Sequence, residues 1–310
     1  MKSDLRIAAV VVTYNRKELL KECLQALLNQ TRPLDEIIVI DNASTDGTEQ
    51  MVRSEFPQVT YVKLPENIGG AGGFHEGMKL AYEEGYDWIW VMDDDAEPEP
   101  TTLDVLLEYI KEADILVPVI VDPLGRKRGG GYWRFGYKPV DLTCCSDAII
   151  PIELFSFVGP LFKREVIDHI GLPRKDFIIW ADDLEWALRA KNKGLTVFIV
   201  RDAFILHKEK KPRVVRRFGR TSVRISQPAW KYYYGMRNKY LLLNNIPWPI
   251  RSIEKLVFLF HVIRWSLGDV LYEPDWWQRI YFRWLGILHG LLGKTGKLVI
   301  PKQKGVKNHR

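Results

Sequence analysis

The sequence is poor in the features that mark secreted, metal-clustered or membrane-spanning proteins. Its three cysteines, Cys23, Cys144 and Cys145, have spacings that suit neither a zinc site nor a disulfide framework, so we expect reduced cysteines in a cytosolic protein. The most apolar late stretch, 256–267, is interrupted by a histidine and an arginine and is too short to span a bilayer, which takes about 20 residues. The first residues leave no room for a signal peptide, so we expect the protein to stay inside the cell.

Acidic and basic residues are divided unevenly along the chain. From Arg201 onward there are 23 Lys and Arg against 6 Asp and Glu, whereas the residues before it hold 22 against 33. This excess predicts contact with an anionic partner such as a membrane surface or a lipid-linked phosphate, with a merely solvated basic surface as the alternative. No nucleic-acid recognition module can be identified, so we expect no nucleic-acid partner.

Strand-like and helix-like segments alternate over the first 95 residues. The segments 7–12, 37–40, 60–64 and 88–92 are rich in apolar residues, and the first three are each followed by a helix-like stretch. This pattern predicts an α/β fold, a mostly parallel twisted sheet with helices on both faces. Ligands bind beyond the carboxyl ends of such strands. The polar residues there should surround one crevice, and they are Thr13, Asp41, Asn67 and Asp93.

Three consecutive aspartates follow the last of these strands. On an extended backbone Asp93 and Asp95 project to the same side and Asp94 points away. Two carboxylates on one side suit Mg²⁺ or Mn²⁺, and such ions complete their coordination with water and substrate phosphates. The alternative is an acidic turn that caps the following helix.

A glycine-rich segment follows the third strand. Asn67 precedes four glycines within residues 69–73, including Gly69 and Gly70, and a backbone without side chains can approach a phosphate or a sugar closely. The spacing does not match a dinucleotide-binding fingerprint. A tight turn without a ligand is the other interpretation.

A second acidic cluster marks a predicted helix start. Asp182 can cap this helix, but capping does not account for Asp183 and Glu185 as well. One of these carboxylates is therefore a candidate general base for an acceptor hydroxyl. His207 ends a later strand-like segment and is either a third metal ligand or an ordinary packed histidine.

Together these motifs resemble the inverting family-2 glycosyltransferases with the GT-A fold. The resemblance covers roughly residues 5–210, and within the family it is strongest to galactofuranosyltransferases and rhamnosyltransferases. The motifs that carry it, in the family's order, are 11–16 (VVTYNR), 39–48 (VIDNASTDGT), 67–74 (NIGGAGGF), 92–95 (MDDD), 180–189 (WADDLEWALR) and His207.

The resemblance implies a role for each group of residues. Asp183 would be the catalytic base, and Asp93, Asp95 and His207 would bind Mn²⁺ or Mg²⁺. The nucleotide and donor site would consist of Thr13, Tyr14, Asn15, Asp41, Asn67, Gly69, Gly70, Asp93 and Asp94, with Asp41 accepting from the pyrimidine ring. The sugar and acceptor pocket would include Gly159, Trp180, Asp182 and Arg237, although core packing explains Trp180 equally well.

The expected organisation has three parts: a catalytic domain over 1–210, a mobile basic loop over 211–227 and a helical region over 228–310. The loop either folds over the diphosphate or is simply solvated. The last helices suit either an anionic membrane surface or packing against the catalytic domain or another subunit, as in a homo-oligomer. A membrane role would place the protein at the inner face of the cell membrane.

The resemblance favours UDP-galactofuranose as donor, with dTDP-rhamnose as the alternative, and a glycan or lipid-linked glycan as acceptor, in cell-wall or polysaccharide biosynthesis. A sugar nucleotidyltransferase could also use paired aspartates on an α/β sheet. That class normally carries a glycine-rich phosphate loop near its N-terminus, and residues 10–15 contain no glycine.

Overall fold

The computed structural model describes residues 5–126, 132–134, 138–142, 146–208, 213–217, 219–224 and 227–300. The chain forms two compact units: Met1–Lys175 with Asp182–Glu209, and Asp176–Ala181 with Lys210–Arg310. The short segment 176–181 thus belongs to the C-terminal unit, although the motifs around it suggest the catalytic domain. Cys144 and Cys145 lie outside the described residues, and Cys23 is a buried free thiol.

A nine-stranded sheet forms the centre of the first unit within the described part of the chain. Its order is β3-β2-β1-β4-β11-β6-β12-β5, and β9 also pairs with β12. The strands are β1 (Ile7–Thr13), β2 (Glu36–Asp41), β3 (Thr60–Lys63), β4 (Trp88–Asp93), β5 (Ala96–Pro98), β6 (Ile115–Val121), β9 (Ile149–Pro151), β11 (Leu161–Lys163) and β12 (Val197–His207). Strands β1 to β4 are parallel, as are β6 and β12, whereas β5, β9 and β11 pair antiparallel with their neighbours.

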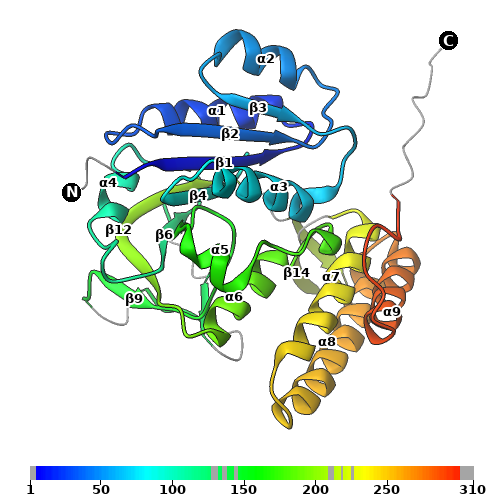
Figure 1. Ribbon diagram of the computed structural model, residues 1–310. Helices are drawn as coiled ribbons and strands as arrows, with labels where there is room; N and C mark the ends of the chain where they lie inside the picture. Colours follow the sequence, from blue (N-terminus) through cyan, green and yellow to red (C-terminus); the bar gives the residue numbers. More distant parts are fainter. Residues whose placement is uncertain are drawn as a thin grey trace, which may run out of the picture. The chain divides into compact units, whose positions relative to one another are not determined.

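Helices cover both faces of this sheet. Every residue of β1 is buried because α3 lies in front of the parallel strands and α1 behind them (Figure 1). The buried residues of α1, Leu20, Cys23, Leu24 and Leu27, recur every three or four positions, as in an amphipathic helix. The α/β fold predicted from the sequence is thereby confirmed. The helices of this unit are α1 (Lys17–Leu28), α2 (Thr48–Glu55), α3 (Gly69–Glu83), α4 (Thr102–Leu107), α5 (Glu165–Ile170) and α6 (Asp182–Asn192).

A small antiparallel sheet accompanies the main one. It has the order β10-β7-β8, and its strands are β7 (Tyr132–Arg134), β8 (Lys138–Pro139) and β10 (Leu154–Phe155).

The C-terminal unit is built on three helices, α7 (Ala229–Leu242), α8 (Ile250–Tyr272) and α9 (Trp276–Leu291). A Cβ atom at Gly286 of α9 would lie 2.3 Å from the carbonyl oxygen of Tyr233, so this glycine allows α9 to lie directly against α7. The core of the unit consists of Met236, Tyr240, Leu243, Ile246, Phe258, Val262 and Ile287. None of the described helices is both long enough and apolar enough to cross a membrane.

The basic segment before α7 contains regular structure. Strands β13 (Arg213–Arg217) and β14 (Arg220–Arg224) pair antiparallel around Gly219, where the sequence suggests an irregular loop. The side chains of Val214 and Val223 are opposite each other and about two-thirds exposed. Alternation of valine and arginine over a few residues is too short a pattern to distinguish a hairpin from a loop.

Candidate functional site

The ends of three neighbouring parallel strands supply the polar residues of the site. Thr13 is in register with Asp41 on β2, and Val12 is in register with Asp93 on β4. Parallel strands finish at the same edge of a sheet, so these residues lie side by side there. Asn67 follows β3 in the loop before α3.

Asp93, Asp95 and His207 form a compact group of potential metal ligands. One ligand atom from each lies within 4.8 Å of the others. The antiparallel pairing of β12 with β5 produces this proximity, because it places His207 opposite Ala96, the residue after Asp95. The structure therefore brings together the three residues that the sequence suggests as ligands.

The chemistry of this group fits a divalent cation. Oδ1 of Asp95 is buried and accepts no well-formed hydrogen bond from the described residues, although Nε2 of His207 lies 3.1 Å away. Burial and the negative charge of Asp95 raise the pKa of Asp93 to about 7. Burial also acts to raise the pKa of Asp95, but the proximity of His207 and the charge of Arg16 outweigh it and lower that pKa. A cation between two carboxylates and an imidazole would coordinate the buried Oδ1 of Asp95 and offset the repulsion between Asp93 and Asp95.

Asp94 points away from this group, toward the first strand. Its Oδ2 accepts a 2.7 Å hydrogen bond from the hydroxyl of Thr13, and its Oδ1 lies 2.9 Å from Nη1 of Arg16. The same nitrogen lies 2.9 Å from Oδ2 of Asp95. Arg16 is thus a residue of the site, although the sequence marks it only as the last position of the motif 11–16. Its guanidinium is partly exposed and can also face an anionic ligand.

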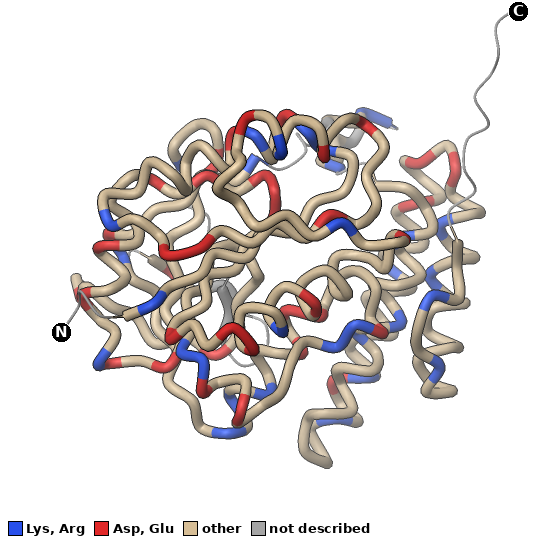
Figure 2. Tube along the Cα trace, turned by 45° about the horizontal axis from the view of Figure 1, so that its top comes forward, with Lys and Arg blue, Asp and Glu red and all other residues tan. Residues whose placement is uncertain are grey.

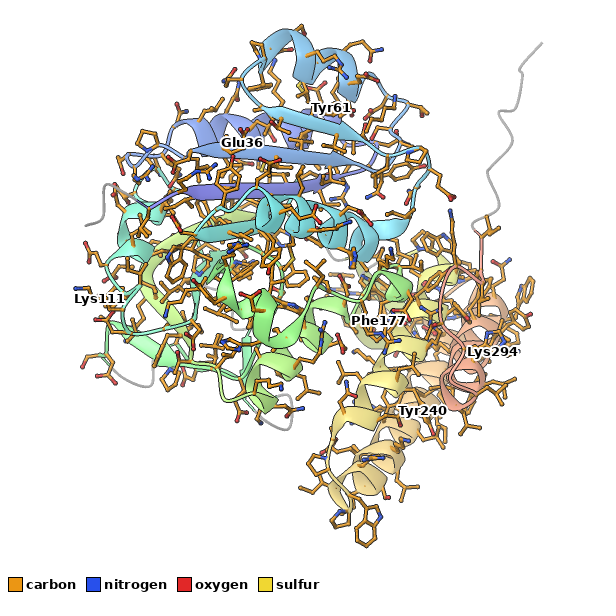
Figure 3. All side chains as sticks on the ribbon, viewed as in Figure 1. Glu36, Tyr61, Lys111, Phe177, Tyr240 and Lys294 are labelled. Carbon is orange, nitrogen blue, oxygen red and sulfur yellow. The ribbon has the colours of Figure 1, made fainter. Side chains whose placement is uncertain are left out.

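Asp41 is completely buried at the end of β2, and both of its carboxylate oxygens have partners. Oδ1 accepts the backbone N–H of Ser44 at 2.9 Å, and Oδ2 accepts the hydroxyl of Tyr61 on β3, which is labelled in Figure 3. Burial and this bond to Asp41 raise the pKa of Tyr61. The hydroxyl of Tyr61 therefore competes for Oδ2 with any ligand N–H that approaches Asp41. Local sequence patterns do not reveal the pairing of Asp41 with Tyr61.

Tyr14 and Asn15 occupy the loop after β1. Asn15 adopts a left-handed conformation with φ of 51°, its N–H donates to Oγ of Ser44 at 2.8 Å, and its Oδ1 accepts the N–H of Thr45 at 2.7 Å. The loops after β1 and β2 are therefore joined. The side chain of Tyr14 is exposed and can contact a ligand.

The glycine-rich segment is the beginning of α3 and not a loop. Cβ atoms at Gly73 and Gly77 would lie 2.5 and 2.4 Å from side-chain atoms of Val12 and Val10, so these glycines let the helix pack closely on β1. At Gly70 no atom lies within 4 Å of such a Cβ, which leaves open space at the start of the helix. Oδ1 of Asn67 accepts the N–H of Gly69 at 2.8 Å.

Asp182 and Asp183 are the first two residues of α6. Burial, the charge of Asp183 and the charge of Asp93 raise the pKa of Asp182 well above its usual range. The charge of Asp93 is one of the causes of this shift, so the start of α6 is within electrostatic reach of the metal-ligand group. Asp183 is more exposed than Asp182, and its Oδ1 accepts the N–H of Leu184 at 2.7 Å.

Gly159 lies in the turn between β10 and β11. Its N–H donates to the carbonyl of Val91 at 2.9 Å, and its carbonyl accepts Nε1 of Trp90 at 2.8 Å. These bonds attach the turn to β4. The glycine itself is explained by its φ of 82° and by the 2.9 Å that would separate a Cβ atom from side-chain atoms of Ile205 and Pro118.

Trp180 and Arg237 belong to the C-terminal unit. Arg237 is completely buried, and its guanidinium donates to the carbonyls of Asp176, Phe177 and Gly296. Trp180 is partly buried, and its ring lies 6.3 Å from that of Tyr232 on α7. The described contacts of both side chains are internal to this unit.

The segment leading to Asp182 has an unusual backbone. Ile178, Trp180 and Ala181 have φ values of 67°, 66° and 65°. Each such residue other than glycine costs on the order of 1 to 3 kcal/mol, and residues of this kind concentrate at functional sites.

Comparisons with known proteins agree with this geometry. The family model "Glycosyl transferase family 2" matches residues 8–142. The galactofuranosyltransferase GlfT1 of Mycolicibacterium smegmatis is 32% identical over 254 residues, which cover 77% of this chain and 83% of that protein. The dTDP-rhamnosyl transferase RfbF of Shigella flexneri is 27% identical over 272 residues, which cover 81% and 85%.

Solved structures show the same fold. Residues 1–349 of S. aureus TarS in complex with UDP-GlcNAc superpose with a TM-score of 0.59 at 17% identity, covering 90% of this chain and 79% of that one. GalNAc-T7 with UDP, GalNAc and Mn²⁺ gives a TM-score of 0.59 at 16% identity, covering 93% and 56%. Sequence similarity over most of both chains, the matched family model and the shared fold lead to one conclusion: this chain is a glycosyltransferase and belongs to glycosyl transferase family 2.

Proposed function

We propose that the protein is a metal-dependent inverting hexosyltransferase that moves a sugar from a nucleoside diphosphate donor to an acceptor hydroxyl. The observation that carries the proposal is the group of Asp93, Asp95 and His207 at the end of β4, with the acidic start of α6 within electrostatic reach of Asp93. A cation site next to a candidate base is what a single displacement of a diphosphate requires.

Some of these residues would bind the cation, and one would transfer a proton. Asp95 and His207 would hold Mn²⁺ or Mg²⁺, with Asp93 beside them. When bound, the cation would neutralise charge on the departing diphosphate. Asp183 would remove the proton of the acceptor hydroxyl as its oxygen attacks the anomeric carbon from the face opposite the diphosphate, which inverts the configuration.

The relatives favour two donors. We propose UDP-galactofuranose first, on the similarity to GlfT1, and dTDP-rhamnose as the alternative, on the similarity to RfbF. Both donors carry a pyrimidine whose ring N–H could donate a hydrogen bond to the carboxylate of Asp41. A glycan or a lipid-linked glycan is the proposed acceptor.

Product analysis with a panel of nucleotide sugars tests the transferase and the metal together. Purified protein with Mn²⁺, a glycan acceptor and one of the two donors should release nucleoside diphosphate as the sugar passes to the acceptor hydroxyl. A nucleotidyltransferase would instead release pyrophosphate when it is given a nucleoside triphosphate and a sugar 1-phosphate. A chelator should suppress the release, and added Mn²⁺ should restore it. Undiminished turnover in the chelator would reject the metal, and no turnover with either donor would reject both sugars.

We also propose that the C-terminal unit binds an anionic membrane surface. On α8 an apolar stripe of Ile253, Leu256, Phe260, Ile263 and Leu267 is between 46% and 70% exposed. These residues are spaced by three or four positions and therefore lie on one face of the helix.

The last helix has a similar stripe of Trp277, Tyr281, Trp284, Leu288 and Leu291, which are between 39% and 63% exposed. Apolar stripes of this extent on a soluble surface mark interaction sites. Tryptophan, tyrosine and leucine are typical of helices that lie in the interface of a bilayer.

Charge favours a membrane over a second copy of the chain. Asp269 is held by Arg224 and Arg283, while Glu273 and Asp275 are held by Arg279. Most acids of the C-terminal unit are thus neutralised internally, and the remaining excess of Lys and Arg, drawn in blue in Figure 2, attracts anionic lipid headgroups. Two copies with the same excess would repel each other.

A further inference from the structure

The turn formed by residues 176–181, which precedes α6, is held by side chains of α7. Nδ2 of Asn238 donates to the carbonyls of Phe177, Ile179 and Trp180 at 2.8, 3.0 and 2.8 Å. An amide has only two N–H groups, so at least one of them is shared. Its Oδ1 accepts Nε of Arg237 at 2.9 Å. Asn238 is completely buried. Its side-chain N–H groups bond the turn, and its side-chain oxygen bonds Arg237.

The two neighbouring side chains share the carbonyl of Phe177 and otherwise hold different parts of the turn. Arg237 reaches the carbonyls of Asp176 and Phe177, at its beginning. Asn238 reaches the carbonyls of Ile179 and Trp180, at its end. The end of the turn is also where the left-handed residues lie, so these bonds oppose the relaxation of the backbone.

Side-chain packing also holds Trp180, at the end of the turn, against α7. A Cβ atom at Gly235 of α7 would lie 2.8 Å from Cε3 of Trp180, so the indole occupies space that only a glycine leaves free. Helix α7 therefore holds Trp180 at two points: Asn238 bonds its carbonyl, and its ring packs against Gly235.

We infer that Asn238 is a positioning residue for the transfer reaction, acting through the turn on Asp183. The turn continues directly into α6, so its conformation constrains the backbone that leads into Asp182 and Asp183. The inference rests on the proposed role of Asp183 as base. A base must be within hydrogen-bond reach of the proton it removes, and a displacement of about 1 Å can reduce the rate about 100-fold.

The variant Asn238→Ala tests this inference. We expect kcat for transfer to fall about 10- to 100-fold while the Kd of the donor, measured by calorimetry, changes less than about twofold. The matched control is Tyr234→Phe, which removes a buried hydrogen bond from the same helix to the carbonyl of Val299, outside the turn. At a comparable decrease in Tm, the control should keep its kcat within about twofold.

A double-mutant cycle separates positioning from a general loss of stability. In the Asp183→Asn background, Asn238→Ala should reduce the residual transfer rate by less than about twofold, because the group that it positions is already gone. If the effect of Asn238→Ala is as large in that background as in the wild type, or if it equals that of Tyr234→Phe, the inference is wrong.

The outcomes also distinguish this inference from the proposed function. A wild-type protein that releases no nucleoside diphosphate, or an Asp183→Asn variant with normal turnover, would contradict the proposed function itself. Should Asn238→Ala not fold, Asn238→Ser keeps one donor, and Gly235→Ala pushes the Trp180 ring from the other side. Both should lower kcat and leave donor affinity unchanged, and normal kcat in both would overturn the inference.

Discussion

Oδ1 of Asp95 and Nε2 of His207 face each other at 3.1 Å, where β12 runs antiparallel to β5. The pairing of these strands brings together two residues that are far apart in the sequence. The two atoms belong to ligand types that bind Mn²⁺, and one of them has no well-formed hydrogen bond from the described residues.

Replacing either ligand should weaken metal binding. We expect Asp95→Asn and His207→Ala each to raise the Kd for Mn²⁺ about tenfold or more, because even partners that only orient a ligand contribute 10- to 100-fold. Electron paramagnetic resonance of free Mn²⁺ measures this directly, without substrate. Asp168→Asn, whose carboxylate bonds Tyr82, is the control and should bind normally. Unchanged affinity in both ligand variants would refute the site.

Asp183→Asn should reduce kcat by about 100- to 10,000-fold, the usual contribution of a general base, without weakening the donor complex. The amide keeps the size of the side chain but cannot take a proton at neutral pH. Single-turnover transfer and donor calorimetry, with Asp168→Asn again as control, separate chemistry from binding. A variant that retains most of its turnover would exclude Asp183 as the base.

The pairing of Asp41 with Tyr61 can be tested with the nucleotide alone. Asp41→Asn should weaken binding of UDP about tenfold, since an amide nitrogen would then face the N–H of the pyrimidine. Tyr61→Phe should not weaken it, because it removes the hydroxyl that competes for Oδ2. Calorimetry with UDP and with dTDP measures both effects. An equal loss in the two variants would mean that the pair serves only the fold of this edge.

The C-terminal helices should bind vesicles that contain phosphatidylglycerol and should bind pure phosphatidylcholine much less. The variants Leu256→Ser with Phe260→Ser, and Trp277→Ser with Trp284→Ser, should reduce cosedimentation several-fold, because they remove exposed apolar area. Gln278→Ala, at an exposed polar position of α9, should bind like the wild type.

Light scattering during gel filtration distinguishes a membrane from a second copy of the chain. If the wild type is a dimer that these variants convert to a monomer, and vesicle binding does not change, the apolar stripes form a subunit interface and the membrane proposal fails.

Local patterns in the sequence were sufficient for the strands and for the positions at their ends. Thr13, Asp41 and Asp93 follow uninterrupted apolar runs, and a parallel sheet places the ends of such runs together. The glycines at 69–73 were harder to interpret, because whether glycine serves a loop or the close packing of a helix depends on the neighbouring strand.

Contacts between distant segments could not be predicted from local sequence patterns. Arg16 approaches Asp94 and Asp95, and Asn238 holds the carbonyls before α6, but neither residue carries a local signal for its partner. The assignment of 176–181 to the C-terminal unit has the same origin. Its residues follow the first unit in the chain, and hydrogen bonds from α7 determine where they fold.

The placement of residues 176–181 in the C-terminal unit matters for any truncation of the protein. A fragment ending at residue 209 would keep the aspartates, the histidine and Asp183, and so every group proposed to take part in the chemistry. It would lack Asn238 and Arg237, leaving three left-handed residues without the bonds that hold them. With Asp183 as the proposed base and Asn238 as its inferred positioning residue, the helical unit would be more than a detachable anchor, because cutting it away would release the segment that leads to Asp183.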